Sequence, residues 1–412
     1  MACNRSSDKD KVIENKNELE GNITILSSGD AAKALNDAAV KFSKQYPKVQ
    51  IEVKEVKDAS SYVAVSAALA SGVSMPDMFT IEGDKVQLLA SSFPDKILDL
   101  TSEVSSNKDK YLKSKQEEIE INKKIYGYPW TGEPIALFYR DDIFKAAGIN
   151  GEDIKTWQQY IDSSKTINAY SKKDVKMLAV QDMEELYRVL LCELGTGYFN
   201  NSDKSVLASQ SSIKAMTMLK SLKDANLIYN YTDMKSLISE IKNGNVVSLQ
   251  MNVLGAKILK EQCNELNGKW NVMELPAFEY GGKTAAASSG LDIMVTSSAK
   301  DKKAVQQFAR FVTREANTSS DAFIKYGLFP CYTPLLNDST FENKVGYFNG
   351  QKIWRVFNKV SKEVKGINYT SNNIETKQAV KEAVDKIINK NEDIKITLEE
   401  LQKNIEAKIN KK

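Results

Sequence analysis

The sequence predicts an α/β protein built from two domains. In its N-terminal part, short apolar and β-branched runs at 23–26, 49–53 and 77–81 alternate with helical patterns at 34–46 and 60–70. This alternation is typical of a parallel sheet with crossover helices on its faces. The chain has 412 residues, more than a single hydrophobic core ordinarily organises, so two domains are expected.

Later segments continue the same mixture of strands and helices. Apolar runs at 135–139, 246–251 and 291–295 predict buried strands, and helical patterns dominate from about 156 to 260. Two capping boxes, each a threonine followed three residues later by glutamine or glutamate, predict helix starts at Thr156 and Thr397. The second would open a final helix.

Composition excludes several classes of function. Lys and Arg number 57 against 54 Asp and Glu, a balance that argues against a dedicated nucleic-acid binder. No stretch approaches the ~20 apolar residues of a membrane-spanning helix. The chain has no histidine, which removes Ser-His-Asp, Cys-His and His-ligated metal chemistry. Enzymes without histidine exist, but an enzyme is less expected here. We expect no catalytic residues, no metal and no cofactor.

The four cysteines, at 3, 192, 263 and 331, form no CxxC pair and predict neither a zinc site nor a dense disulfide framework. The last three lie in apolar or mixed surroundings and are expected to be buried free thiols. Cys3 differs, because it follows Ala2 and precedes a polar stretch. Residues 1–21 predict a disordered tether. This start is typical of a mature bacterial lipoprotein whose cysteine carries lipid; the alternative is an incidental cysteine.

The order of segments along the chain carries a family resemblance. From about residue 22 onward the chain resembles the extracellular solute-binding proteins of bacterial carbohydrate-uptake ABC transporters, the maltose-binding-protein-like group of family 1. The segments that carry the resemblance are 46–49, 69–79, 98–101, 125–149, 156–160, 243–249, 274–277, 297–300 and 326–330.

The resemblance implies a periplasmic-binding-protein-like fold, in which two lobes close on a ligand in the cleft between them. The first lobe would comprise 22–131 and 286–333, and the second 135–283 and 337–412. The chain would cross between lobes near 131–134, 283–286 and 334–337. Glycine-rich and proline-marked junctions fall at these places.

Ligands of open α/β sheets gather at the carboxyl ends of strands, which directs attention to polar residues that follow the predicted strands. Trp130 could stack on a sugar ring or pack in the core. Asp30 could accept a sugar hydroxyl or cap a helix. Glu133 and Asp182 match cleft acids of the family, and Asn252 stands where an aromatic of the family would be. The candidate ligand contacts are Ser28, Asp30, Glu82, Asp84, Trp130, Glu133, Asp182, Asn252, Asp292 and Tyr332.

The resulting expectation is a monomeric, substrate-binding lipoprotein of a bacterial ABC importer. It would bind a sugar or oligosaccharide and deliver it to the membrane permease. Its place would be the outer face of the cell membrane, held by the lipid on Cys3, in a cell of Gram-positive type. Two alternatives stay open. The same fold could bind a polyamine, phosphate ester or peptide, or the chain could be a glycosidase with two carboxylates about 5–10 Å apart.

Overall fold

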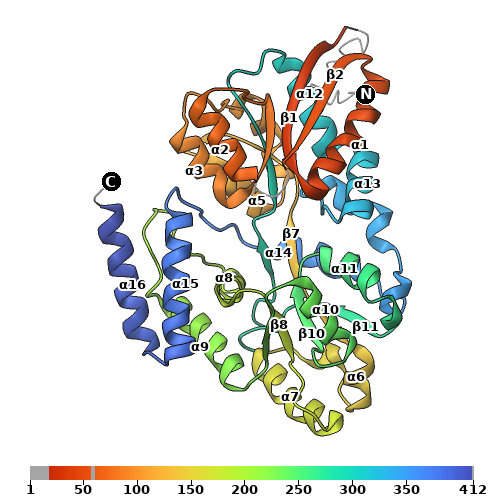
Figure 1. Cartoon of the computed structure of the whole chain (residues 1–412), viewed down its shortest axis with the longest axis vertical. Coiled ribbons are helices and arrows are strands. Elements are labelled where there is room, and N and C mark those ends of the chain that lie inside the picture. Colours follow the sequence, from red (N-terminus) through yellow and green to blue (C-terminus); the bar gives the residue numbers. More distant parts are fainter. Residues whose placement is uncertain (1–17, 57–60, 411–412) are drawn as a thin grey trace, which may run out of the picture.

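The computed structural model describes residues 18–56 and 61–410, and Cys3 with most of the predicted tether lies outside them. Two β-sheets organise two lobes, one above the other in Figure 1. The first sheet has the strand order β2-β1-β3-β13-β6. Its strands are β1 (Glu20–Ser28), β2 (Lys48–Val56), β3 (Met78–Glu82), β6 (Tyr128–Pro129) and β13 (Leu291–Val295).

The N-terminal half of this sheet has the predicted crossover arrangement. Strand β1 pairs in parallel with both β2 and β3, and helices α1 (Gly29–Gln45) and α2 (Ser61–Ser71) connect them. Strand β13 returns from later in the chain and pairs antiparallel with β3. The other elements of this lobe are η1 (Gly83–Lys85), α3 (Val86–Ser92), α4 (Thr101–Val104), η2 (Ser105–Lys110), α5 (Lys113–Glu118), β4 (Glu120–Ile121), β5 (Lys124–Ile125), α12 (Lys302–Arg314) and α13 (Ala316–Tyr326).

The second sheet has the order β11-β7-β10-β8-β9, with β12 paired to the start of β7. Its strands are β7 (Glu133–Arg140), β8 (Leu178–Val180), β9 (Ile228–Asn230), β10 (Ser248–Met251), β11 (Trp270–Met273) and β12 (Ala286–Ser288). The surrounding helices are α6 (Asp141–Ala146), η3 (Gly151–Asp153), α7 (Trp157–Ser171), α8 (Met183–Glu193), α9 (Gln210–Asp224), α10 (Met234–Lys242), α11 (Leu254–Gln262), η4 (Asn264–Leu266), η5 (Thr333–Asn337), η6 (Ser339–Glu342), η7 (Gly346–Phe348), α14 (Ile353–Glu363), α15 (Asn373–Lys390) and α16 (Ile394–Ile409).

The chain passes between the lobes on neighbouring strands. Strand β6 belongs to the first sheet, and β7 begins four residues after Pro129 and runs into the second (Figure 1). On the way back, Ser288 of β12 lies opposite Glu133 of β7, and Leu291 then enters the first sheet beside Glu82. A third passage follows the bridge between Pro330 and Thr131.

Helix starts test the two predicted capping boxes. At α7 the prediction is confirmed, because the Thr156 side chain accepts from Gln159 N and the Gln159 side chain accepts from Thr156 N. At α16 it is wrong. That helix begins at Ile394, and its cap is Asp393, whose carboxylate accepts from Ile396 N at 2.9 Å. Thr397 therefore lies inside the helix, where it is buried.

The structure describes three of the four cysteines. Cys192, Cys263 and Cys331 are free and buried, as predicted. In the described parts of the chain, no helix has the length and apolar character needed to cross a membrane.

Candidate functional site

A cavity of about 200 Å³ lies between the lobes, where the strands of both sheets end. The first lobe contributes side chains after β1 and β3, and the second contributes the start of β7 and the segment after β10. The residues that line it are Ser28, Asp30, Ala31, Ser61, Thr80, Glu82, Glu133, Asn252, Leu254, Leu291, Tyr326, Gly327 and Leu328. Five of the predicted contacts are among them: Ser28, Asp30, Glu82, Glu133 and Asn252.

A second cavity, of about 150 Å³, adjoins the first at Asn252 and Leu254. It lies at the carboxyl ends of β8 and β10, and predicted residue Asp182 lines it. Its other lining residues are Ile135, Ala179, Val180, Gln181, Glu185, Leu186, Tyr231, Gln250, Met251 and Ser288. Together the two cavities present hydroxyls, carboxylates and amides beside apolar and tyrosine surfaces.

Glu133 and Asn252 both line the first cavity and are hydrogen-bonded to each other. Asn252 Nδ2 donates to Glu133 Oε2 at 3.1 Å, and Asn252 Oδ1 accepts from Leu254 N at 2.9 Å. Burial raises the pKa of Glu133, and the hydrogen bond from Asn252 only partly offsets it. A carboxyl group in this state binds a hydroxyl as acceptor when ionised and as donor when protonated.

Asp30 stands in the first turn of α1 and reaches across to the second lobe. Lys257 Nζ of α11 lies 2.7 Å from Asp30 Oδ2, and Lys33 Nζ lies 2.8 Å from Oδ1. Burial opposes ionisation of Asp30, but the hydrogen bonds from both lysines outweigh it and lower the pKa. Asp30 is therefore an ionised carboxylate. It does not cap α1; Ser28 stands at that position and makes no side-chain cap bond.

Ser28 and Glu82 line the first lobe's wall at the ends of β1 and β3. Ser61 Oγ donates to Ser28 Oγ at 2.9 Å, which joins the start of α2 to the end of β1. Lys85 Nζ lies 3.0 Å from Glu82 Oε2. These contacts hold both side chains at the cavity wall.

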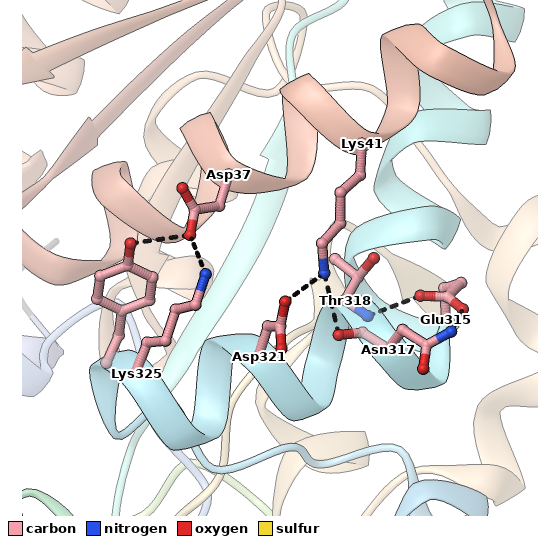
Figure 2. Close-up of polar contacts among 8 residues, drawn as sticks. Asp37, Lys41, Glu315, Asn317, Thr318, Asp321 and Lys325 are labelled. Carbon is pink, nitrogen blue, oxygen red and sulfur yellow. Dashed lines mark hydrogen bonds and ion pairs between the residues drawn. The ribbon is translucent and has the colours of Figure 1, made fainter.

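Tyr326 supplies an aromatic surface that the sequence analysis did not select. It ends α13 beside Gly327, and its hydroxyl donates to Asp37 of α1 at 3.0 Å. Ion pairs hold α13 against α1, with Lys325 Nζ 3.0 Å from Asp37 Oδ2 and Lys41 Nζ 2.6 Å from Asp321 Oδ2 (Figure 2). The packing of α1 on α13 therefore sets the position of Tyr326.

Four predicted contacts do not line either cavity. Trp130 is 4% exposed and belongs to a hydrophobic core that includes residues of both lobes. Tyr332 packs against Tyr111, with ring centroids 5.2 Å apart. Asp84 stands in η1, and its Oδ1 is buried without a hydrogen bond. The remaining one, Asp292, lies in a buried ionic cluster.

That cluster joins α5 to β13 and to the returning chain. Lys115 Nζ lies 3.0 Å from Asp292 Oδ2, contacts Glu118 Oε2, and donates to the carbonyl of Ser289 at 2.6 Å. All three charged side chains are almost fully buried. Burial raises the pKa of Asp292 to about 6, with Lys115 acting in the opposite direction. In this conformation Asp292 binds a lysine of its own lobe.

Sequence reasoning also missed Leu254, Gln250, Tyr231 and Lys257. Gln250 stands near the end of a predicted strand and Tyr231 directly follows β9, so the rule of strand carboxyl ends would have selected both. Leu254 and Lys257 lie on helix α11. No local pattern distinguishes them from other helical residues. Among the described residues, no three histidine, cysteine or acidic side chains gather as metal ligands.

Comparison of the sequence with known proteins identifies the family of this chain. The family model described as bacterial extracellular solute-binding protein matches residues 26–319. The lactose-binding protein of Rhizobium radiobacter is 22% identical over 342 residues, which cover 81% of this chain and 80% of that protein. The arabinooligosaccharide-binding protein of Bacillus subtilis is 22% identical over 338 residues, covering 79% and 77%.

Comparison with solved structures shows the same two-lobe fold. The structure of the sugar-binding protein MalE from Xanthomonas citri superposes with a TM-score of 0.81 at 15% identity, covering 95% of this chain and 98% of that one. The two-lobe architecture predicted from the order of segments is thereby confirmed. The chain belongs to the bacterial extracellular solute-binding protein family.

Proposed function

We propose that this chain binds a sugar or oligosaccharide in the interlobe cavity and delivers it to the permease of an ABC importer, without catalysing a reaction. The observation that carries the proposal is the lining of the cavity by both lobes. Hydrogen-bonding side chains such as Ser28, Asp30 and Glu133 stand beside the apolar surfaces of Leu254, Leu328 and Tyr326. Sugars present this combination, because hydroxyl groups surround weakly polar C–H faces.

The names of the relatives support the same ligand class. One is a lactose-binding protein and another an arabinooligosaccharide-binding protein. The lobes in this proposal are 22–131 with 286–333, and 135–283 with 337–412. The protein would act as a monomer.

A thermal-shift screen tests the ligand class. The panel contains mono-, di- and oligosaccharides, with a polyamine, a phosphate ester and a peptide as the contrasting solutes. A ligand present at 100 times its Kd adds about 2.7 kcal/mol to the free energy of unfolding, so a saccharide that binds should raise the Tm. Stabilisation by one of the contrasting solutes, with none by any saccharide, would contradict the proposal.

The lipid anchor is a separate part of the proposal. Cys3 follows Ala2 in a polar N-terminal segment, and we propose that it carries the lipid holding the protein on the outer face of a Gram-positive cell membrane. The full-length precursor expressed in such a host should partition with membranes, whereas its Cys3→Ser variant should be released. Equal retention of both forms would show that Cys3 is not the anchor.

A further inference from the structure

The cavity between the lobes and the adjoining second cavity, which the second lobe lines, form two consecutive compartments. Of these two, Asp30 lines only the first and Asp182 only the second, whereas Asn252 and Leu254 line both. The shared residues therefore lie between the two aspartates. A ligand that fills the site runs from Asp30, past Asn252 and Leu254, to Asp182. Asp182 also lines, with Lys381, a further cavity of about 260 Å³ beyond the second compartment.

An aspartate–lysine ion pair stands at the Asp30 end. Lys257 Nζ lies 2.7 Å from Asp30 Oδ2, and this contact joins α11 of the second lobe to α1 of the first. The backbones approach closely here as well: a Cβ on Gly327 would lie 3.7 Å from Leu254 Cα. The lobes therefore meet directly at this end of the site.

A second ion pair stands at the Asp182 end. Lys381 Nζ of α15 lies 2.6 Å from Asp182 Oδ2. Asp182 Oδ1 also accepts from Glu184 N at 3.0 Å, which caps α8. Both oxygens of Asp182 are thus held by protein groups, and the carboxylate is a fixed wall of the second compartment.

The compartments are small. Their volumes are about 200 and 150 Å³, a size that suits one pyranose or furanose ring with its hydroxyl groups in each. Each compartment alone is smaller than the ~300 Å³ at which sites for drug-sized ligands begin.

We infer that the ligand is a saccharide of two rings, with one ring in each compartment. This inference rests on the proposed function and specifies its substrate. A third ring would have to break the Asp30–Lys257 pair or the Asp182–Lys381 pair, or hold the lobes apart. Either change gives up contacts between protein groups that a ligand of two rings leaves intact.

Calorimetric titration with saccharides of graded length tests the inference. The probes are galactooligosaccharides and arabinooligosaccharides of one to four rings. In a series that binds, the Kd should fall at least tenfold from one ring to two and change less than threefold from two rings to four. A further tenfold fall in Kd at the third or fourth ring, or a single ring that binds as tightly as two, would overturn it. Absence of binding in both series, together with no binding by any saccharide of the thermal-shift panel, overturns the proposed function itself.

Variants at the two ends give a second readout. Lys257→Met and Lys381→Met each remove one closing ion pair, and Lys260→Met is the matched control, because Lys260 is exposed on the same helix as Lys257. In at least one end variant, the ratio of the Kd for three rings to the Kd for two rings should fall at least threefold below the wild-type ratio. The control should keep the wild-type ratio. An unchanged ratio in both end variants would contradict the assignment of these pairs as the ends of the site.

Discussion

Glu133 links the chemistry of single residues to ligand choice. It starts the strand that passes between the lobes, lines the first cavity, and accepts a hydrogen bond from Asn252. Glu133→Gln replaces a group of acceptors with a mixed donor and acceptor. The substitution should therefore change the ranking among sugars rather than weaken all of them equally. Titration of both proteins with two competing sugars measures this, and an unchanged ranking would argue against direct contact.

The protonation state of Glu133 predicts a pH dependence. Burial raises the pKa of this carboxyl group above its usual range. A sugar hydroxyl that donates to the carboxylate favours the ionised form, so binding lowers this pKa. The Kd should then rise as the pH falls through the raised pKa. Glu133→Gln should lose this part of the pH dependence, and a parallel profile in both proteins would assign the dependence to another group.

Trp130 is a residue for which the sequence allows two roles, stacking on a sugar ring and packing in the core. The sequence suggests a stacking platform for sugar, a role that stays a prediction, while the structure buries the indole to 4% exposure within the core. Truncation of a core tryptophan costs about 3–5 kcal/mol. We expect Trp130→Ala to lower the free energy of unfolding by this amount in a urea titration. Unchanged stability with a sugar affinity weakened by about 1–3 kcal/mol would instead favour stacking.

At the scale of elements, α16 offers a direct test of helix capping. Asp393 is exposed, and its carboxylate accepts from Ile396 N. Loss of such a cap costs about 0.5–2 kcal/mol, so Asp393→Ala should destabilise the protein by that amount in chemical denaturation. Asp393→Asn should retain most of the stability, because its side-chain oxygen can still accept. Equal losses in both variants would mean that capping is not the cause.

The same helix shows what local sequence patterns can and cannot predict. The capping-box pattern is correct at Thr156, yet at Thr397 an identical spacing lies inside a helix that Asp393 caps. Short apolar and β-branched runs likewise predicted the segments of β1, β2 and β3. Ser28 and Glu82 were predicted because ligands of open α/β sheets bind at the carboxyl ends of strands. Lys257 was not, since its role depends on how the second lobe meets the first.

The ionic cluster at α5 and β13 stabilises the passage between lobes. Lys115 is almost fully buried, with Glu118 and Asp292 as its partners. Removing one partner of a buried ion pair costs about 3–5 kcal/mol, because the remaining charge is uncompensated. Lys115→Met should therefore be strongly destabilised in urea. Lys113→Met, on the exposed side of the same short helix, serves as the control and should remain close to wild type.

The cluster also predicts how stability depends on pH. Burial raises the pKa of Asp292 to about 6, above the value of 3.8 for an unperturbed aspartate. Between these values the folded protein holds a proton that the unfolded chain has released, so the free energy of unfolding should fall as the pH rises from about 4 to 6. Asp292→Asn should lack this contribution. A stability profile identical to wild type across that window would contradict the assignment.

At the scale of the whole molecule, passages of the chain and contacts between side chains join the lobes. Strands β7 and β12 pair at the passage, with Ala286, Ala287 and Ser288 opposite Ile135, Pro134 and Glu133. The third passage runs by the bridge between Thr131 and Pro330, and Phe323 of α13 packs on Trp354 of α14. The lobes also meet through polar side chains, including the Asp30–Lys257 pair and a hydrogen bond of 3.3 Å from Gln87 to Asn368. Such polar contacts near the surface contribute little each. A ligand held by both lobes can therefore shift the balance between open and closed arrangements.

This balance can be measured as a distance between the lobes. Val63 of the first lobe and Tyr280 of the second are exposed by 58% and 81%. Because Cys192, Cys263 and Cys331 are buried, cysteines introduced at these two positions in a Cys3→Ser background can carry spin labels. A saturating saccharide that binds should narrow the distance distribution measured by pulsed electron spin resonance, since only the closed arrangement lets both lobes contact it. Small-angle scattering should show no increase in the radius of gyration.

Labels on Val63 and Val73, both in exposed positions of the first lobe, give the matched control and should report no change. If calorimetry shows binding while the Val63–Tyr280 distribution stays as broad as before, the ligand does not act by closing the lobes.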